Sequence, residues 1–270
     1  MEIKKNPLVT IIITNFNKSK YLTKAIKSCL NQKYQNIEII FFDDKSTDNS
    51  LKKVKDFKIK NKINLKLITN TNKKKKTAPI NQIVGIRRSL SATKGKFIFF
   101  LDSDDFFHKN KIYEIFNIFL ENKNNKLIFD QPIYKYKNKE IKKNYSNKKV
   151  KNKWPKFPPT SCMSFETQTL KKVINKLNFK KYPNLAIDFY LAVYYSIILN
   201  KFYIHKSHLT YYRQLSDGTD SKYLKYRSKY WWIRRGEAFE FLNDLLLNNK
   251  KSKNQSLDYF TTKVINKLLK

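Results

Sequence analysis

The first hundred residues contain four short apolar runs rich in β-branched and aromatic side chains, separated by segments in which apolar residues have helical spacing. The apolar runs cover residues 8–14, 37–42, 65–69 and 97–101, and the helical segments cover about 19–31, 48–60 and 79–93. Continuous apolar strands that alternate with helices predict an α/β fold with a parallel sheet covered on both faces. Right-handed crossovers gather the carboxyl ends of such strands along one edge, where open α/β sheets bind ligands.

Polar clusters follow three of the four predicted strands, at residues 14–17, 43–48 and 102–105. The last cluster holds Asp102, Asp104 and Asp105, in a chain with only 21 acidic residues against 57 basic ones. Carboxylate oxygens are the ligands that Mg²⁺ and Mn²⁺ prefer, so the cluster is a candidate cation site. An Asx-rich turn before a helix that begins near Asn110 is the alternative. Convergence of the three clusters at one sheet edge favours the cation site over the turn.

The formal net charge of +36 has three possible explanations. A phosphate-binding surface would make the chain a nucleic-acid-binding protein, and diffuse lysine could also hold it on an anionic membrane. The excess is mostly lysine spread over the whole length, alongside abundant Asn, Ile, Phe and Tyr. All these residues have A/T-rich codons, which favours compositional bias as the source of the charge. The charge alone therefore does not select a class of protein.

Motifs that the sequence lacks exclude some classes of protein. The sequence has four glycines and no Gly-x-Gly-x-x-Gly turn or P-loop, which disfavours dinucleotide oxidoreductases and P-loop NTPases. A nucleotide would have to be held by side chains and a metal instead. The two cysteines, Cys29 and Cys162, fit a reduced compartment. No signal peptide and no run of about 18 apolar residues is seen. We expect a soluble, cytoplasmic protein, with peripheral contact at the inner face of the membrane as an option.

The second half of the chain is less regular. Residues 122–157 are rich in Lys and Asn and predict strand and loop, and a strand is expected at 161–165. Helices are expected at about 166–177, 186–199, 221–249 and 255–269. We therefore expect one domain over 1–220, with halves 1–121 and 122–220, and a C-terminal helical extension over 221–270. The extension is basic and amphipathic, so it would either pack on the rest of the chain or lie on an anionic membrane.

The first 105 residues resemble the N-terminal signature of glycosyltransferase family 2. The matching motifs are Val9–Asn17, then Leu22, Ala25, Ile26, Ser28, Asn31 and Gln32, then Glu38–Asp48 and Leu101–Asp105. The resemblance implies a GT-A fold, a Rossmann-like and mostly parallel sheet flanked by helices. It also implies inverting transfer of a sugar from a nucleotide diphosphate, with residues 1–121 binding the nucleotide sugar and residues 122–220 binding the acceptor.

The resemblance also implies roles for individual residues. Asp104 would bind the metal, and Asp102 would contact the ribose or share the metal. Asp105 would orient its neighbours or cap the next helix. Donor contacts are implied at Thr14, Phe16, Asn17, Asp44, Lys75, Asn81, Ser103 and Arg213. Lys75 is alternatively part of a solvated lysine run, and Arg213 part of a buried ion pair. The chain departs from the family in lacking the glycine and arginine before Asn81 and in having Leu215 where a histidine is common.

An inverting transferase also needs a base for the acceptor hydroxyl. The family supplies it from a Glu-Asp pair that opens a helix, and the matching element here has Ile187 followed by Asp188. Asp188 is the only acid between Glu166 and Asp217, and its neighbours are apolar. Apolar surroundings disfavour the charged form of a carboxylate and make it a stronger base. Capping of the helix at 189–199 is the alternative role.

These observations predict a transferase that uses Mn²⁺ or Mg²⁺. The donor would be a nucleotide-diphosphate sugar, most simply a UDP-sugar, and the acceptor a hydroxyl of a saccharide or lipid-linked molecule. The expected process is synthesis of a cell-surface polysaccharide or lipopolysaccharide, and no nucleic-acid partner is expected. A metal-dependent nucleotidyltransferase and a basic nucleic-acid-binding protein are the alternatives.

Overall fold

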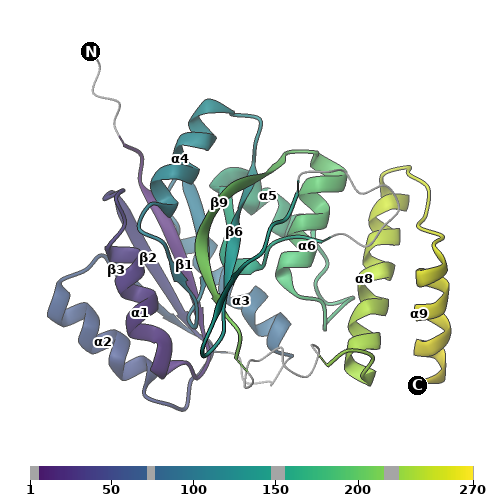
Figure 1. Cartoon of the computed structure of the whole chain (residues 1–270), viewed down its shortest axis with the longest axis horizontal. Helices are drawn as coiled ribbons and strands as arrows, with labels where there is room; N and C mark the ends of the chain where they lie inside the picture. Colours follow the sequence, from purple (N-terminus) through teal and green to yellow (C-terminus); the bar gives the residue numbers. More distant parts are fainter. Residues whose placement is uncertain (1–5, 72–76, 147–155, 216–224, 270) are drawn as a thin grey trace.

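The computed structural model describes residues 6–71, 77–146, 156–215 and 225–269 (Figure 1). The strands are β1 (Val9–Asn15), β2 (Ile37–Asp43), β3 (Leu65–Thr69), β4 (Phe97–Asp102), β5 (Phe106–Phe107), β6 (Leu127–Lys135), β7 (Glu140–Lys142), β8 (Met163–Glu166) and β9 (Phe202–Arg213). The α-helices are α1 (Ser19–Leu30), α2 (Ser50–Asn61), α3 (Ala78–Ala92), α4 (Lys111–Glu121), α5 (Thr167–Lys176), α6 (Ile187–Val193), α8 (Lys229–Asn248) and α9 (Leu257–Leu268). A 3₁₀ turn, η1 (Thr160–Cys162), precedes β8, and a π-helical segment, η2 (Tyr194–Leu199), continues α6.

One sheet runs through both predicted halves, in the order β3-β2-β1-β4-β8-β6-β9-β5, with β7 beside β6. Strands β1 to β4 are parallel to one another, as the sequence predicts. Strand β8 pairs antiparallel to β4 and β6, while β6 and β9 are parallel. The reversal at β8 brings the start of that strand, rather than its end, to the edge where β4 ends.

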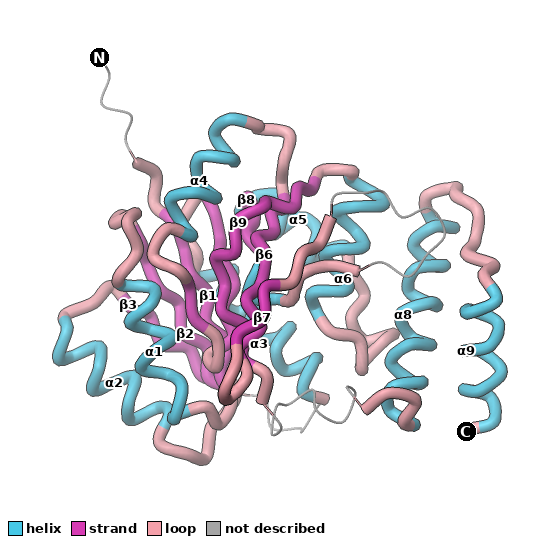
Figure 2. The backbone as a smooth tube through the Cα atoms, viewed as in Figure 1, coloured by secondary structure: helices cyan, strands magenta, loops and turns pink. Residues whose placement is uncertain are grey.

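Helices cover both faces of the parallel part of the sheet, as Figure 2 shows. On β1, Ile12 joins a core cluster with residues of α3, α5 and α6, while its neighbours Ile11 and Ile13 join a second cluster with residues of α1, α2 and α4. The alternation follows from the two-residue period of a strand. Helix α3 lies so close to the sheet that a Cβ on Gly85 would come within 2.3 Å of the Phe42 ring. The predicted doubly covered sheet is confirmed.

The C-terminal helices α8 and α9 pack side by side at one end of the molecule (Figure 1). On α8, Phe241, Leu242 and Leu245 are buried in the core cluster shared with α6. These apolar residues of α8 thus pack on the rest of the chain. Helix α8 begins at Lys229, later than the predicted 221, and the expected boundary at 220 lies outside the described residues. Among the helices that the structure describes, none is long and apolar enough to span a membrane.

Candidate active site

The carboxyl ends of β1, β2 and β4 lie next to one another, as expected. Thr14 is paired with Asp102 and Asn15 with Asp43 in the registers of the parallel strands. A cleft opens beyond these strand ends. It is lined from the first half by Thr14, Asn15, Phe16, Lys18, Phe42, Asp44, Ala78, Pro79, Gln82, Asp102, Ser103 and Asp104, and from the second by Pro159, Thr160, Ala186, Asp188, Tyr212, Arg213, Gln214 and Leu215. Residues expected to serve donor, metal and catalysis therefore share one cavity.

Asp102 is oriented by contacts from three elements. Its Oδ1 accepts hydrogen bonds from Thr14 Oγ1 at 2.8 Å and from Gln82 Nε2 at 2.7 Å. Its backbone N–H donates to Ser161 Oγ at 3.0 Å. Gln82 was not foreseen, whereas its predicted neighbour Asn81 is not among the cleft residues. Successive helix positions point about 100° apart, so one of two neighbours on α3 can face the cleft while the other does not.

Asp104 projects into the cleft beside two cationic side chains. Lys18 Nζ lies 3.5 Å from its Oδ2, and the Arg213 guanidinium donates to its backbone carbonyl. Burial raises the pKa of Asp104 above the usual value, and Lys18 and Arg213 act in the opposite direction. The Arg213 guanidinium also lies over the rings of Phe106 and Tyr21, at 4.8 and 5.0 Å from their centroids. Arg213 is therefore fixed by aromatic contacts at the rim of the acidic cluster.

Asp105 is buried and does not line the cleft. Its Oδ2 accepts a hydrogen bond from Ser161 Oγ at 2.6 Å, and its Oδ1 accepts one from the backbone N–H of Arg213 at 2.8 Å. Burial, followed by the charges of Asp104 and Asp102, raises its pKa well above the usual value. The contacts fit the expected orienting role, because they tie β9 and η1 to the end of β4. Helix α4 begins six residues later, at Lys111, so Asp105 does not cap it.

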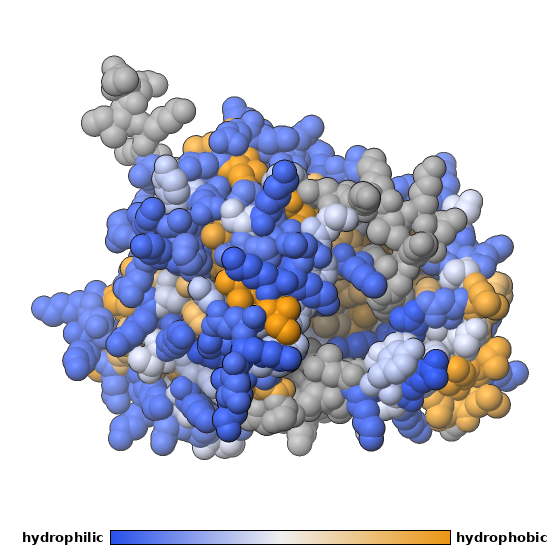
Figure 3. Space-filling model, in the orientation of Figure 1, coloured by the Kyte–Doolittle hydropathy of each residue, from blue (hydrophilic) through white to orange (hydrophobic). Residues whose placement is uncertain are grey.

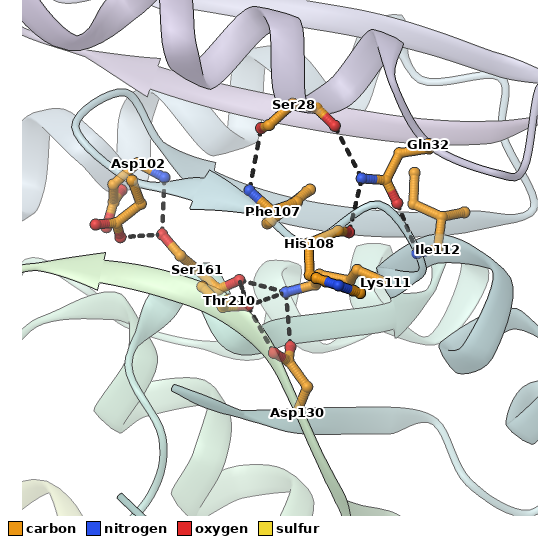
Figure 4. Close-up of polar contacts among 11 residues, drawn as sticks. Ser28, Gln32, Asp102, Phe107, His108, Lys111, Ile112, Asp130, Ser161 and Thr210 are labelled. Atoms are coloured by element: carbon orange, nitrogen blue, oxygen red, sulfur yellow. Dashed lines mark hydrogen bonds and ion pairs between the residues drawn. The ribbon is translucent and has the colours of Figure 1, made fainter. Parts of the chain in front are cut away.

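The buried ion pair of Lys111 and Asp130 lies next to Ser161 (Figure 4). Lys111 Nζ lies 2.6 Å from Asp130 Oδ1 and donates to Ser161 O and Thr210 Oγ1, each at 2.6 Å. Thr210 Oγ1 in turn donates to Asp130 Oδ2 at 2.6 Å. Both members of the pair have fully buried side chains. The network joins α4, β6 and β9 to η1, so it fixes the position of the hydroxyl that contacts Asp102 and Asp105.

The remaining predicted donor residues fall into three groups. Phe16 and Asp44 line the cleft, and Asp44 Oδ1 accepts a hydrogen bond from Asn70 Nδ2 at 2.5 Å. Asn17 is not among the cleft residues, and its Oδ1 instead accepts from Thr47 N at 2.7 Å, which joins the loops after β1 and β2. Lys75 lies outside the described residues.

Asp188 lies in the first turn of α6, on the side of the same cleft that the second half of the chain provides. Thr160 Oγ1 donates to its Oδ2 at 3.4 Å, a long contact. The residue at the N-cap is Ala186, but Asp188 Oδ1 accepts a hydrogen bond from the backbone N–H of Phe189 at 2.7 Å, so the carboxylate also satisfies an N–H of the first turn. Asp188 and Asp104 therefore reach one cavity from opposite halves of the chain.

The segment before Asp188 is anchored on two sides. Asn184 donates from its backbone N–H and its Nδ2 to the two carboxylate oxygens of Glu237 on α8, at 2.7 and 2.6 Å. Its carbonyl accepts from Arg234 Nε at 2.8 Å. On the other side, Thr77 Oγ1, just before α3, donates to Pro183 O at 2.5 Å. The C-terminal helix α8 is thus connected to the segment that carries Asp188.

The family model for glycosyl transferase family 2 matches residues 10–187. The chain belongs to glycosyltransferase family 2. The matched region contains the strand-end motifs that suggested the family and extends to the residue before Asp188. The predicted family is confirmed.

Curated relatives of this family-2 chain are named glycosyltransferases. An uncharacterized glycosyltransferase of Haemophilus influenzae is 40% identical over 118 residues, which is 43% of this chain and 44% of the relative. The Escherichia coli UDP-Glc:α-D-GlcNAc-diphosphoundecaprenol β-1,3-glucosyltransferase WfgD is 35% identical, covering 43% and 42%. The Staphylococcus aureus poly(ribitol-phosphate) β-N-acetylglucosaminyltransferase TarP is 24% identical, covering 95% and 79%. The chain thus spans less than half the length of the first two relatives.

Among solved structures, S. aureus TarS residues 1–349 in complex with UDP has a TM-score of 0.65 and 16% identity. The match covers 97% of this chain and 70% of TarS 1–349. At that identity the likeness is one of fold. The predicted GT-A fold is confirmed.

The carboxylates of the family-2 cleft suit a cation that takes its other ligands from a substrate. Within the described ranges, no three His, Cys, Asp or Glu side chains are grouped to hold a metal ion by themselves. Mg²⁺ in nucleotide sites is commonly held by one or two carboxylates together with substrate phosphates. Asp104 and Asp102 provide two such carboxylates in one cleft. The residues present therefore fit a divalent cation that a diphosphate helps to bind.

Proposed function

We propose that this chain transfers a sugar, with inversion, from a nucleotide-diphosphate sugar to an acceptor hydroxyl. The observation that carries the proposal is the single cleft into which Asp102 and Asp104 project from the end of β4 and Asp188 from the start of α6. Asp102 and Asp104 suit a cation that would neutralise the diphosphate leaving group. Asp188 suits removal of the proton from the acceptor hydroxyl. The placement of these carboxylates on two halves of the chain leaves room for donor and acceptor between them.

Seven of the residues that line the cleft have a defined part in this proposal. Asp104, with Asp102, would hold a divalent cation, which stabilises the negative charge that develops on the diphosphate. Lys18 and Arg213 add positive charge next to Asp104. Thr14 and Gln82 hold Asp102 in one orientation. Asp188 accepts the proton of the acceptor hydroxyl as that oxygen attacks the anomeric carbon.

Leu215 lines the cleft at the position where the family resemblance implies a histidine. An apolar side chain provides no ligand for a cation or diphosphate at that point, so this position contributes shape only. Arg213, two residues earlier, is the cationic side chain that β9 places there. We therefore assign the charge contribution of this segment to Arg213.

The names of the relatives support a UDP-sugar donor and a cell-surface acceptor. TarS binds UDP, WfgD uses UDP-Glc and a lipid-linked saccharide, and TarP acts on poly(ribitol-phosphate). We extend these classes to this chain as the proposed donor and acceptor, in the synthesis of a surface polysaccharide. Release of pyrophosphate from a nucleoside triphosphate would instead identify a nucleotidyltransferase.

The metal assignment is tested by Asp104→Ala. Calorimetric titration with UDP-GlcNAc, UDP-Glc and GDP-mannose, each with and without Mn²⁺, should find a donor whose binding the metal strengthens. In Asp104→Ala that strengthening should disappear, because the carboxylate that shares the cation is gone. The matched control is Asp56→Ala on the exposed face of α2. Metal-strengthened binding that survives in Asp104→Ala would reject the assignment.

The base assignment is tested by Asp188→Asn. The amide cannot accept the hydroxyl proton, so transfer should fall by about 10²- to 10⁴-fold while donor binding is retained. Turnover is followed by release of the nucleoside diphosphate with a lipid-linked or polymeric acceptor. A turnover close to that of the unsubstituted protein would place the base elsewhere.

A further inference from the structure

Helix α9 packs on α8 through its more polar side. Thr262 is the residue of α9 that is fully buried, and Asn266 Nδ2 donates to Trp232 O at 2.8 Å. The ring of Tyr259 meets that of Phe239 on α8, with centroids 5.6 Å apart. Tyr259, Thr262 and Asn266 thus lie on the side of α9 that faces α8, where Ile265 is also half-buried.

Four other aliphatic and aromatic residues of α9 are exposed to solvent. Leu257, Phe260, Val264 and Leu268 are 83, 50, 59 and 80% exposed. Their spacing of three, four and four residues places them in a single stripe along the helix. We call these four residues the α9 stripe. Figure 3 shows hydrophobic surface at the end of the molecule where Figure 1 places α9.

The α9 stripe has positively charged surroundings. Lys263 and Lys267 on α9 are exposed, as are Lys250 and Lys253 in the connection from α8, whereas Lys251 Nζ donates to Ile197 O at 2.6 Å. The one carboxylate on α9, Asp258, forms an ion pair with Arg235. The apolar stripe is therefore bordered by lysines, and the nearest acid on its own helix is already neutralised.

We propose that the α9 stripe binds an anionic lipid surface, with α9 lying along the headgroup layer. An apolar face flanked by lysines is the pattern of helices that rest in the membrane interface, where anionic lipids neutralise the basic residues. A second copy of this chain is a poorer partner. Face-to-face packing would bring the same lysines together between two molecules that each carry a formal charge of +36. This inference concerns a surface outside the proposed active site.

Vesicle sedimentation of the full chain tests the proposal, without donor or acceptor present. The chain should sediment with vesicles of phosphatidylcholine and phosphatidylglycerol, far less with phosphatidylcholine alone, and less at high salt. A Phe260→Ser, Leu268→Ser double variant should bind the anionic vesicles at least tenfold more weakly. The matched control is Ile59→Ser, which removes a side chain 76% exposed on α2 at the opposite end of the molecule (Figure 1).

Two results would overturn the proposal. One is unchanged sedimentation of the double variant when its thermal unfolding matches that of the unsubstituted chain. The other is a dimer, by light scattering, that the double variant converts to a monomer, because the stripe would then be covered by a second copy. Since lipid binding is measured without substrates, neither result bears on the proposed transfer reaction, and loss of transfer activity would not bear on the stripe.

Discussion

Lys111 shows how much of the cleft depends on one residue that no ligand can touch. Its ammonium group is fully buried, yet it contacts Asp130, Thr210 and the carbonyl of Ser161 at 2.6 Å each. Taking two charges out of water is costly, and burial raises the pKa of Asp130 despite the lysine beside it. The pair is therefore best understood as a positioning device for η1, whose Ser161 hydroxyl connects Asp102 and Asp105.

Substitution of one partner should cost far more than substitution of both. Lys111→Met leaves the Asp130 carboxylate buried without its counter-ion, and we expect a loss of about 3–5 kcal/mol in the free energy of unfolding. The double variant Lys111→Met, Asp130→Leu should recover most of that loss, as measured by urea denaturation. Equal losses in the single and double variants would contradict this account of the pair.

At the scale of residues, the sequence predicts the cleft residues that follow the parallel strands, but few of those that other elements contribute. Thr14, Asp44, Asp102 and Asp104 were assigned to the site because parallel strands end together, and all four line the cleft. Ser161 and Gln82 were not foreseen. Their roles depend on η1 and on the rotation of α3, which no local pattern specifies. The carboxylate assigned as base was found from a resemblance and an absence of competing acids.

At the scale of elements, α8 supports the segment that leads to Asp188 on one side of the cleft. Glu237 receives two hydrogen bonds from Asn184, and Arg234 donates to the carbonyl of the same residue. Asp188 follows four residues later in the chain. A helix expected to be an extension thus fixes the approach of α6 to the cleft.

Loosening this contact should slow transfer and leave donor binding unchanged. Glu237→Gln cannot accept both hydrogen bonds from Asn184, and a shift of about 1 Å at a reacting group can cost about 10²-fold in rate. We expect kcat to fall about tenfold or more, with the KM for the donor unaltered. Glu240→Gln, an exposed carboxylate on the same helix, is the matched control. A raised donor KM with unchanged kcat would contradict the positioning role.

The elements themselves were predicted unevenly, for a physical reason. The first four strands and their helices have strong periodicity, and the structure places them within a few residues of the expected bounds. The direction of β8 could not be predicted, because an apolar run of four residues has the same pattern in either orientation. Likewise the expected helix over 186–199 changes at Tyr194 to π-helical geometry, which apolar spacing does not distinguish.

For the whole molecule, the charge imbalance limits stability. With 57 basic and 21 acidic residues, most lysines have no carboxylate to pair with, and their mutual repulsion opposes the compact state. Several described lysines instead lie over aromatic rings, such as Lys24 at 3.8 Å from the centroid of Phe106. Such contacts do not remove the repulsion between like charges.

Simple salt should therefore stabilise this protein. The screening length falls from about 30 Å at about 0.01 M to about 10 Å at about 0.1 M, so repulsion between exposed lysines weakens over that range. We expect the Tm to rise over this interval, equally in sodium chloride and potassium chloride. A Tm that stays constant or falls would show that charge repulsion is not a limiting term.

The double anchoring of the segment before α6 also constrains how this chain can vary. Thr77 contacts Pro183 and α8 contacts Asn184, so two neighbouring residues are held in place five and four residues before Asp188. One inserted or deleted residue would rotate the first turn of α6 by about 100° and turn Asp188 away from the cleft. Point substitutions in this stretch should accordingly be accepted more readily than changes in its length. Homologous chains with an active cleft should conserve that spacing even where its residues differ.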